Sequence, residues 1–191
     1  MDKNMKDPFD TSSEKSDEAN QTSIKRPLVL VGLMGVGKTT VGRRLASKLG
    51  LPFVDADEEI EKAAGLSVAE IFDRFDEEYF RDGERRVIAR LIGENPQVIA
   101  TGGGAFMNDD TRALILSKAT AIWLDADLDV LVKRVGRRDT RPLLRQGDPA
   151  KILADLAAKR NPIYAMAQIH VTGNDSPHEI TVENIVKALS K

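Results

Sequence analysis

A glycine-rich run near the start of the chain carries the residue types that bind the phosphates of a nucleotide. It reads Gly32-Leu-Met-Gly-Val-Gly-Lys-Thr39. Backbone N–H groups of such a loop can approach polyphosphate because glycine has no side chain in the way, and the lysine contacts the outer phosphates. The threonine hydroxyl reaches Mg²⁺. The run predicts binding of ATP or a similar triphosphate through Gly35, Val36, Gly37, Lys38, Thr39 and Thr40.

Two carboxylates, Asp55 and Asp57, follow the apolar segment 53–54. In open parallel sheets, ligands bind outside the carboxyl ends of the strands, so both side chains are expected near the phosphate loop. One carboxylate can hold the metal, directly or through water, and the other can accept a proton or hydrogen bond from an acceptor hydroxyl. The alternative is that Asp57 only caps the helix expected at 58–64.

A charged pair and a glycine triplet also have the spacing of site residues. Arg81 and Glu84 lie three apart, so they share a helix face and can pair, although a surface ion pair is the commoner outcome. The glycines at 102–104 follow the strand expected at 98–100. They indicate a close approach of backbone to a ligand, or alternatively a plain flexible turn.

Two basic regions complete the set. Six basic residues and one acid, Asp139, lie within 133–145. A loop of this length is usually functional, and a lid over a transferring phosphate is one case. The alternatives are a solvated basic loop or a nucleic-acid patch. Arg160 stands at the end of the helix expected at 148–159. It can bind a carboxylate with two hydrogen bonds, or serve only as a helix-terminal cation with Pro162 as the stop.

The elements that position these residues alternate between strands and helices. That order predicts a three-layer α/β/α fold with a five-stranded parallel sheet covered on both faces. Gly50 is expected to cap the first helix, and Ser67 with Glu70 forms a capping box. Strands are expected at 28–31, 53–54, 98–100, 121–124 and 168–172, and helices at 38–49, 58–64, from 68, 84–92, 111–118, 128–135, 148–159 and 180–189.

Composition places the chain among ordinary globular proteins. Its 191 residues are 41% hydrophobic and 30% charged, with a net charge of −2 and no cysteine. These values disfavour disulfide or thiolate chemistry and a surface built for nucleic acid or anionic membranes. Residues 1–26 are polar and mixed in charge, so we expect a disordered extension there, followed by one domain at 27–191. We also expect a cytoplasmic monomer.

The ordered set of motifs resembles the shikimate kinase family over residues 27–191. The motifs are the phosphate loop, Phe53-x-Asp55-x-Asp57, Phe80-Arg-x-x-Glu84, the glycines 102–104, Arg141-Pro-Leu-Leu and Arg160-x-Pro-x-Tyr164. The resemblance implies a P-loop kinase fold with a mobile lid at about 136–147 and a substrate-binding region at about 55–92. It implies transfer of the γ-phosphate of ATP to the 3-hydroxyl of shikimate, with one Mg²⁺.

The resemblance also implies roles for individual residues. It makes Lys38, Asp57 and Arg141 catalytic. It also makes Arg81 a substrate-binding residue, whose guanidinium Glu84 is expected to orient. Whether Arg137 or Arg138 stacks on adenine stays open. The implied ATP contacts are the six loop residues with Arg138 and Arg141, the metal residues are Thr39 and Asp55, and the substrate residues are Asp57, Arg81, Gly102, Gly103, Gly104 and Arg160.

Three other functions are alternatives to this one. A P-loop kinase of another small hydroxy acid, such as gluconate, shares the phosphate loop but has less reason for both Arg81 and Arg160. A GTPase switch needs Asn-Lys-x-Asp and Asp-x-x-Gly motifs, and neither string occurs in the sequence. A non-catalytic nucleotide-binding module is disfavoured because Lys38, Asp57 and Arg141 are all present.

Overall fold

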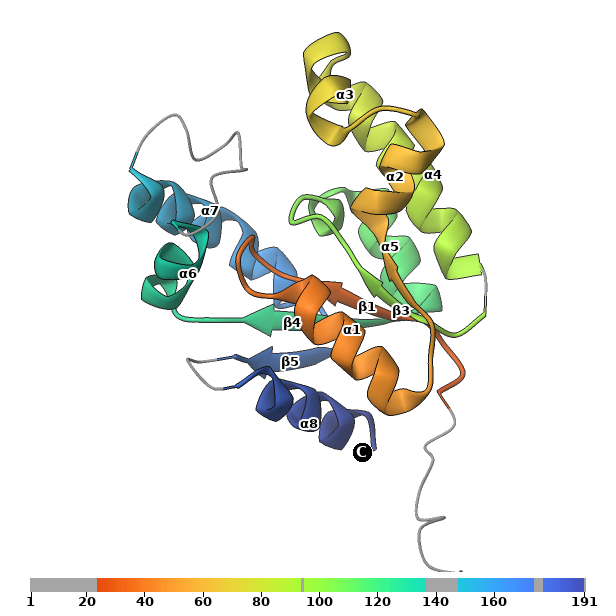
Figure 1. Cartoon of the computed structure of the whole chain (residues 1–191), viewed down its shortest axis with the longest axis vertical. Helices are drawn as coiled ribbons and strands as arrows, with labels where there is room; N and C mark the ends of the chain where they lie inside the picture. The colour runs from red at the N-terminus through yellow and green to blue at the C-terminus, as the bar shows by residue number, and fades with distance from the viewer. Residues whose placement is uncertain (1–23, 94, 137–147, 174–176, 191) are drawn as a thin grey trace, which may run out of the picture.

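The computed structural model describes residues 24–93, 95–136, 148–173 and 177–190, and its strands form one five-stranded sheet (Figure 1). The strand order is β2-β3-β1-β4-β5, and every neighbouring pair is parallel. This confirms the predicted sheet. The strands are β1 (Leu28–Val31), β2 (Phe53–Asp55), β3 (Val98–Ala100), β4 (Thr120–Asp125) and β5 (Ile169–Thr172).

Helices cover both faces of the sheet, as the alternating pattern predicted. Helices α1 and α8 pack together on the face toward the viewer in Figure 1, whereas α5 and α7 lie behind the sheet. Helices α2, α3 and α4 contact one another beyond the end of the sheet. The helices are α1 (Lys38–Leu49), α2 (Ala56–Ala64), α3 (Val68–Arg74), α4 (Glu77–Gly93), the short 3₁₀ helix η1 (Ala105–Met107), α5 (Asp109–Lys118), α6 (Leu128–Val135), α7 (Pro149–Tyr164) and α8 (His178–Leu189).

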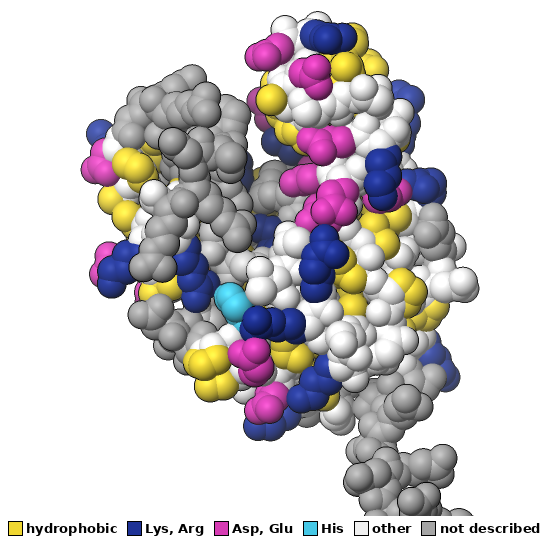
Figure 2. All heavy atoms as spheres, in the orientation of Figure 1, with side chains coloured by type: hydrophobic (Ala, Val, Ile, Leu, Met, Phe, Trp, Pro, Cys, Tyr) yellow, Lys and Arg dark blue, Asp and Glu magenta, His cyan; other side chains and the backbone are white. Residues whose placement is uncertain are grey.

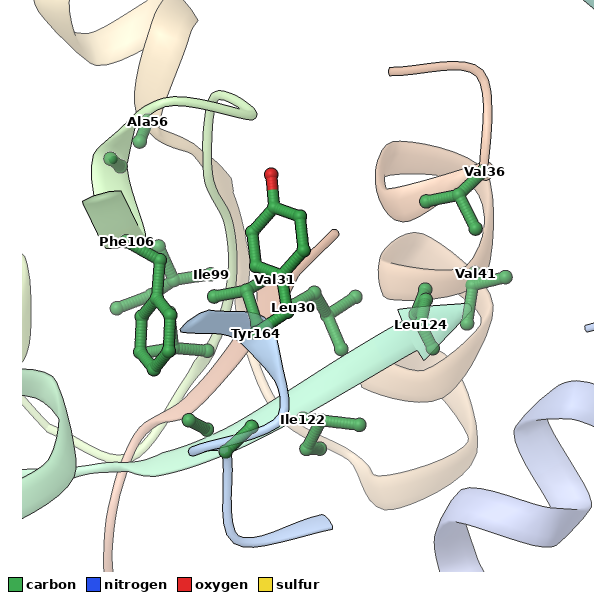
Figure 3. Close-up of a cluster of buried hydrophobic side chains, with 14 of the residues drawn as sticks. Leu30, Val31, Val36, Val41, Ala56, Ile99, Phe106, Ile122, Leu124 and Tyr164 are labelled. Atoms are coloured by element: carbon green, nitrogen blue, oxygen red, sulfur yellow. The ribbon is translucent and has the colours of Figure 1, made fainter. Parts of the chain in front are cut away.

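The core lies along the central strand β1 and its neighbour β3. All residues of β1 and β3 are buried, as expected of strands covered on both faces. Figure 3 shows Leu30 and Val31 of β1 among side chains from β3, β4 and the helices. Because this core fixes β1 and β3 side by side, the loops that follow them emerge next to each other at one edge of the sheet.

Two predicted helix ends are confirmed by their backbone geometry. Gly50 ends α1 in the left-handed conformation, with φ of 65° and its N–H donating to carbonyls of the last turn. Ser67 begins α3 with a complete capping box, in which its hydroxyl accepts from the N–H of Glu70 and the Glu70 carboxylate accepts from the N–H of Ser67.

Helix α4 begins at Glu77, so the predicted start at residue 84 is wrong. The Asp76 carboxylate accepts from the backbone N–H of Tyr79 at 2.8 Å and so satisfies a free donor of the first turn. The buried face of α4 runs from Phe80 through Glu84 to Val87 and beyond. The apolar pattern misplaces the start because a buried carboxylate occupies one position of that face.

Helix α7 continues through Pro162 to Tyr164, so Pro162 does not stop it. The proline removes one backbone donor. The following N–H groups of Ala165 and Ala167 still find carbonyl partners, on Asn161 and Tyr164 respectively, each at 2.9 Å. The extra turn places Tyr164 fully inside the core, one turn beyond Arg160.

The surface carries mixed charge. Figure 2 shows acidic and basic side chains side by side on this face. Arg43 of α1 pairs with Glu58 of α2, and Arg44 of α1 pairs with Glu179 of α8. Within the described ranges, no helix combines the length and apolar composition that crossing a bilayer requires. Of the expected N-terminal extension, residues 24–26 are described, and Ile24 packs against the core.

Candidate active site

The phosphate loop connects β1 to α1 and owes its shape to three glycines with positive φ. The φ angles are 140° at Gly32, 82° at Gly35 and 97° at Gly37. A methyl group on Gly35 would lie 2.6 Å from a methyl carbon of Val135, so a larger residue would strain both the backbone and the packing. The predicted context of strand, loop and helix is therefore present.

Lys38 is the first residue of α1, and its ammonium group lies over the loop. Its Nζ donates to the carbonyl oxygens of Gly32 at 2.7 Å and of Leu33 at 3.0 Å. A cation is thus held beside the N-terminus of a twelve-residue helix, where free N–H groups and the helix dipole also favour anions.

Asp55 joins the phosphate loop to the start of α2. Its Oδ2 accepts from the Thr39 hydroxyl at 2.9 Å, and its Oδ1 accepts from the Asp57 N–H at 3.1 Å. Asp55 is therefore the N-cap of α2, and the alternative that Asp57 only caps this helix is wrong. The carboxylate of Asp57 lies against Gly102, on the other side of the site.

The oxygen pair of Thr39 and Asp55 fits a magnesium ion held partly by nucleotide phosphates. Mg²⁺ prefers oxygen ligands and in kinases is bound by one or two protein groups plus phosphates and water. Within the described part of the chain, no cluster of three or more acidic, histidine or cysteine side chains offers a metal site formed by protein alone. The donor set thus suits a metal that arrives with a nucleotide.

The glycine triplet after β3 brings charged groups from three helices to one loop. A methyl group on Gly102 would lie 3.0 Å from Oδ1 of Asp57 and 3.2 Å from Oε1 of Glu84. These are tight approaches, so a side chain at Gly102 would require both carboxylates to shift by a few tenths of an ångström.

The next two glycines meet cations instead. A methyl group on Gly103 would lie 3.2 Å from Nη1 of Arg160 and 3.6 Å from the Gly32 carbonyl oxygen. One on Gly104 would lie 2.6 Å from both terminal nitrogens of Arg81. These contacts favour the close approach over the plain flexible turn, and they place Gly103 directly against the phosphate loop.

Arg81 and Glu84 form the predicted pair, and the pair is buried on its acidic side. The guanidinium donates to Glu84 at 2.7 Å and to Glu77 at 3.2 Å. The Glu84 side chain is only 3% exposed and that of Arg81 is 27% exposed. This geometry excludes a surface ion pair, and the guanidinium lies against Gly104 while staying partly exposed.

Burial and charge shift the pKa values of this pair. Burial raises the pKa of Glu84 above its usual value, and the attraction of Arg81 offsets only part of that effect. Burial alone would lower the pKa of Arg81, but its bonds to Glu84 and Glu77 raise it. Arg81 is therefore a permanent cation whose direction is fixed by a buried carboxylate.

Two basic side chains, those of His178 and Arg134, lie beside the phosphate loop. His178, to which the sequence analysis gave no site role, lies against Gly37, where a methyl group would be 3.3 Å from its Cε1. Nη1 of Arg134 donates to the Val36 carbonyl at 3.5 Å. Arg134 belongs to the basic run at 133–145 for which a lid is one expected role. Arg138, Arg141 and the predicted lid at about 136–147, apart from Gly136, lie outside the described residues.

This fold and site define a P-loop kinase of a small molecule, because a phosphate loop lies next to a second loop, the glycines at 102–104, that is surrounded by charged side chains. The family model for shikimate kinase matches residues 34–190, and the chain belongs to that family. A shikimate kinase of Novosphingobium aromaticivorans is 58% identical over 172 residues, covering 88% of this chain and 89% of the relative. One of Caulobacter vibrioides is 60% identical over 164 residues, covering 86% of this chain and 82% of the relative.

Solved structures agree with this family. The shikimate kinase from Acinetobacter baumannii in complex with shikimate has a TM-score of 0.83 and 34% identity, and the match covers 87% of this chain and 93% of that one. A gluconokinase from Sinorhizobium meliloti, at a TM-score of 0.60 and 18% identity, shares the fold alone.

Proposed function

We propose that this chain transfers the γ-phosphate of ATP to the 3-hydroxyl of shikimate. The observation that carries the proposal is the contact between the two halves of the site at Gly32. The carbonyl oxygen of Gly32 accepts from Lys38 on one side and lies 3.6 Å from a methyl position on Gly103 on the other. A phosphate held by the loop would therefore be next to a ligand held at the glycines.

The charges on the glycine loop suit a small hydroxylated carboxylate such as shikimate. Arg81 and Arg160 supply two guanidinium groups for a carboxylate, and guanidinium matches carboxylate geometry. Asp57 lies at the other end of the loop, where it would accept a hydrogen bond from the attacking hydroxyl or take its proton. Glu84 holds Arg81 in place through the buried hydrogen bond.

Phosphoryl transfer of this kind depends on positioning and on charge stabilisation. Lys38 would move its ammonium from the loop carbonyls to the outer phosphates, and the loop N–H groups would bind the remaining oxygens. Thr39 and Asp55 would hold Mg²⁺, which when bound neutralises phosphate charge. Arg141, as a second cation at the transferring group, stays a prediction.

An ADP-release assay with shikimate, quinate and gluconate tests the proposal. We expect turnover with shikimate at a kcat/KM far above that for the other two, and an NMR spectrum of the product with phosphorus coupled to the proton at C3. Preference for gluconate would establish the alternative hydroxy-acid kinase. ATP binding without turnover on any acceptor would establish a non-catalytic module.

We propose further that the protein acts as a cytoplasmic monomer with no nucleic-acid or membrane partner. The mixed charge over α1 and α2 supports the absence of nucleic-acid and membrane partners, because a surface that binds nucleic acid or an anionic membrane needs a continuous basic patch (Figure 2). Sedimentation in the presence and absence of ATP tests the oligomeric state.

A further inference from the structure

Tyr164 is a buried polar residue to which the phosphoryl transfer proposed above assigns no role. Its side chain is fully buried, between the rings of Phe106 and Trp123, whose centroids lie 6.4 Å and 6.2 Å away. Figure 3 shows its hydroxyl as the one oxygen drawn among the labelled side chains of this cluster. A tyrosine hydroxyl in a core needs a partner, and the identity of that partner shows what the residue does.

The partner is the glycine loop of the candidate active site. The Tyr164 hydroxyl donates to the carbonyl oxygen of Gly103 at 2.5 Å. That carbonyl belongs to the same trans peptide as the N–H of Gly104, and the two groups point in opposite directions. The phenol bond therefore fixes the rotation of a peptide whose flanking residues have no side chains to restrict it.

The same hydroxyl is close to the guanidinium of Arg160. These residues are four apart on α7, so they lie on one face of the helix. Burial raises the pKa of Tyr164 to about 12, and the interaction with Arg160 offsets part of the rise. The phenol is thus protonated throughout the working pH range and always available as a donor.

We infer that Tyr164 is a positioning residue for the acceptor substrate, because its hydroxyl fixes the Gly103–Gly104 peptide against Arg160. A methyl position on Gly103 lies 3.2 Å from Arg160 and one on Gly104 lies 2.6 Å from Arg81, so rotation of this peptide would disturb both guanidinium groups. The inference deepens the proposed function and rests on it. It assigns no contact between Tyr164 and the substrate itself.

Tyr164→Phe tests the inference because it keeps the stacked ring and removes only the hydroxyl. We expect KM for shikimate to rise roughly 2- to 12-fold, the contribution of about one hydrogen bond, with KM for ATP unchanged. Shikimate affinity measured by calorimetry should fall by the same factor. A purely structural role would not separate the two substrates in this way.

Gln97→Met is the matched control for lost stability. Gln97 is buried, and its Nε2 donates to the Leu91 carbonyl at 2.9 Å, so this variant also removes one buried bond from a side chain to a carbonyl. It precedes β3, whereas the glycines follow it. We expect a lower melting temperature, by about 2–4 °C for each kcal/mol lost, and unchanged KM values for both substrates.

Arg160→Ala, measured in parallel, separates failure of the inference from failure of the proposed site. If Arg160→Ala raises KM for shikimate and Tyr164→Phe does not, the site stands and the inference is overturned. If neither variant changes it, the assignment of the site itself is wrong. Equal rises in both KM values for Tyr164→Phe, or failure of that variant to fold, would show a structural role and also overturn the inference.

Discussion

Gly104→Ala should weaken binding of the acceptor substrate without unfolding the protein. Gly104 has φ of −94° and ψ of −16°, a conformation that alanine adopts freely, so the backbone can stay as it is. The added methyl group would lie 2.6 Å from both terminal nitrogens of Arg81. The substitution therefore acts on one side chain of the proposed site.

The magnitude follows from how firmly Arg81 is held. Its guanidinium must move by about 0.8 Å, from 2.6 Å to the 3.4 Å of ordinary contact. It cannot do so freely, because Glu84 holds it at 2.7 Å and is buried. A displacement of that size removes one charge-assisted hydrogen bond to a substrate carboxylate, about 1.5–3 kcal/mol. KM for shikimate should then rise roughly 10- to 150-fold.

Initial rates at saturating ATP, with shikimate varied, measure this effect. Gly83→Ala is the control: a methyl group there has nothing within 4 Å, and alanine in a helix interior adds roughly 0.5–1 kcal/mol of stability. We expect it to melt higher with unchanged KM values. A folded Gly104→Ala enzyme with normal KM for shikimate would refute the role of Arg81 in binding the substrate carboxylate. An equal rise in KM for ATP would refute the claim that Arg81 acts on the acceptor substrate alone.

Three other variants test the remaining parts of the site. Lys38→Ala should lower turnover at least about 100-fold with the fold intact, and near-normal rates would remove the phosphate loop from the mechanism. Arg160→Ala should cost about 2–5 kcal/mol of shikimate binding if it pairs with a buried carboxylate, and an unchanged dissociation constant would contradict that pairing. His178→Gln tests a pH effect. Burial, with Arg134 and Arg44, lowers the pKa of His178 from 6.5, so the unfolded chain takes up its proton first and stability falls as pH drops below 6.5. The variant should lose less stability between about pH 7.5 and about pH 5.5 than the parent, and equal losses would argue against this linkage.

The middle of the sheet could be predicted from the sequence because strands β1 and β3 are buried on both faces. Residues 28–31 and 98–100 are uninterrupted apolar runs, and each forms a fully buried strand. The caps at Gly50 and Ser67 were also predictable, since both depend on residues within one turn of the helix end. These features are local, so a single sequence contains the information for them.

The start of α4 was not predictable in the same way because of Glu84. An apolar residue at that position would continue the apolar pattern of the buried face from Phe80 to Val87. Glu84 interrupts this pattern, and its burial is tolerated because Arg81 neutralises it at 2.7 Å. The residue that interrupts the apolar pattern is thus the one that orients Arg81, a proposed substrate-binding residue.

Neither Tyr164 nor His178 could be assigned to the site from spacing. The partner of Tyr164 is a backbone carbonyl 61 positions earlier, and His178 lies against a glycine of the phosphate loop. Sequence patterns consist of side-chain types at fixed separations along the chain. A contact between a side chain and a distant backbone group produces no such pattern, so only the folded structure, in which the two segments lie together, reveals it.

The glycine triplet explains how these charged groups can gather around one loop. Asp57 and Glu84 approach Gly102, and guanidinium groups approach Gly103 and Gly104, each within 3.2 Å of a methyl position. Any side chain on this loop would push one of those groups away. The order along the loop, carboxylates first and cations after, also gives the site a direction. A hydroxy acid bound there with its carboxylate at the two guanidinium groups would present a hydroxyl to Asp57. Asp57 lies next to Asp55, which bonds to Thr39 of the phosphate loop, so this hydroxyl would face the phosphates of a bound nucleotide.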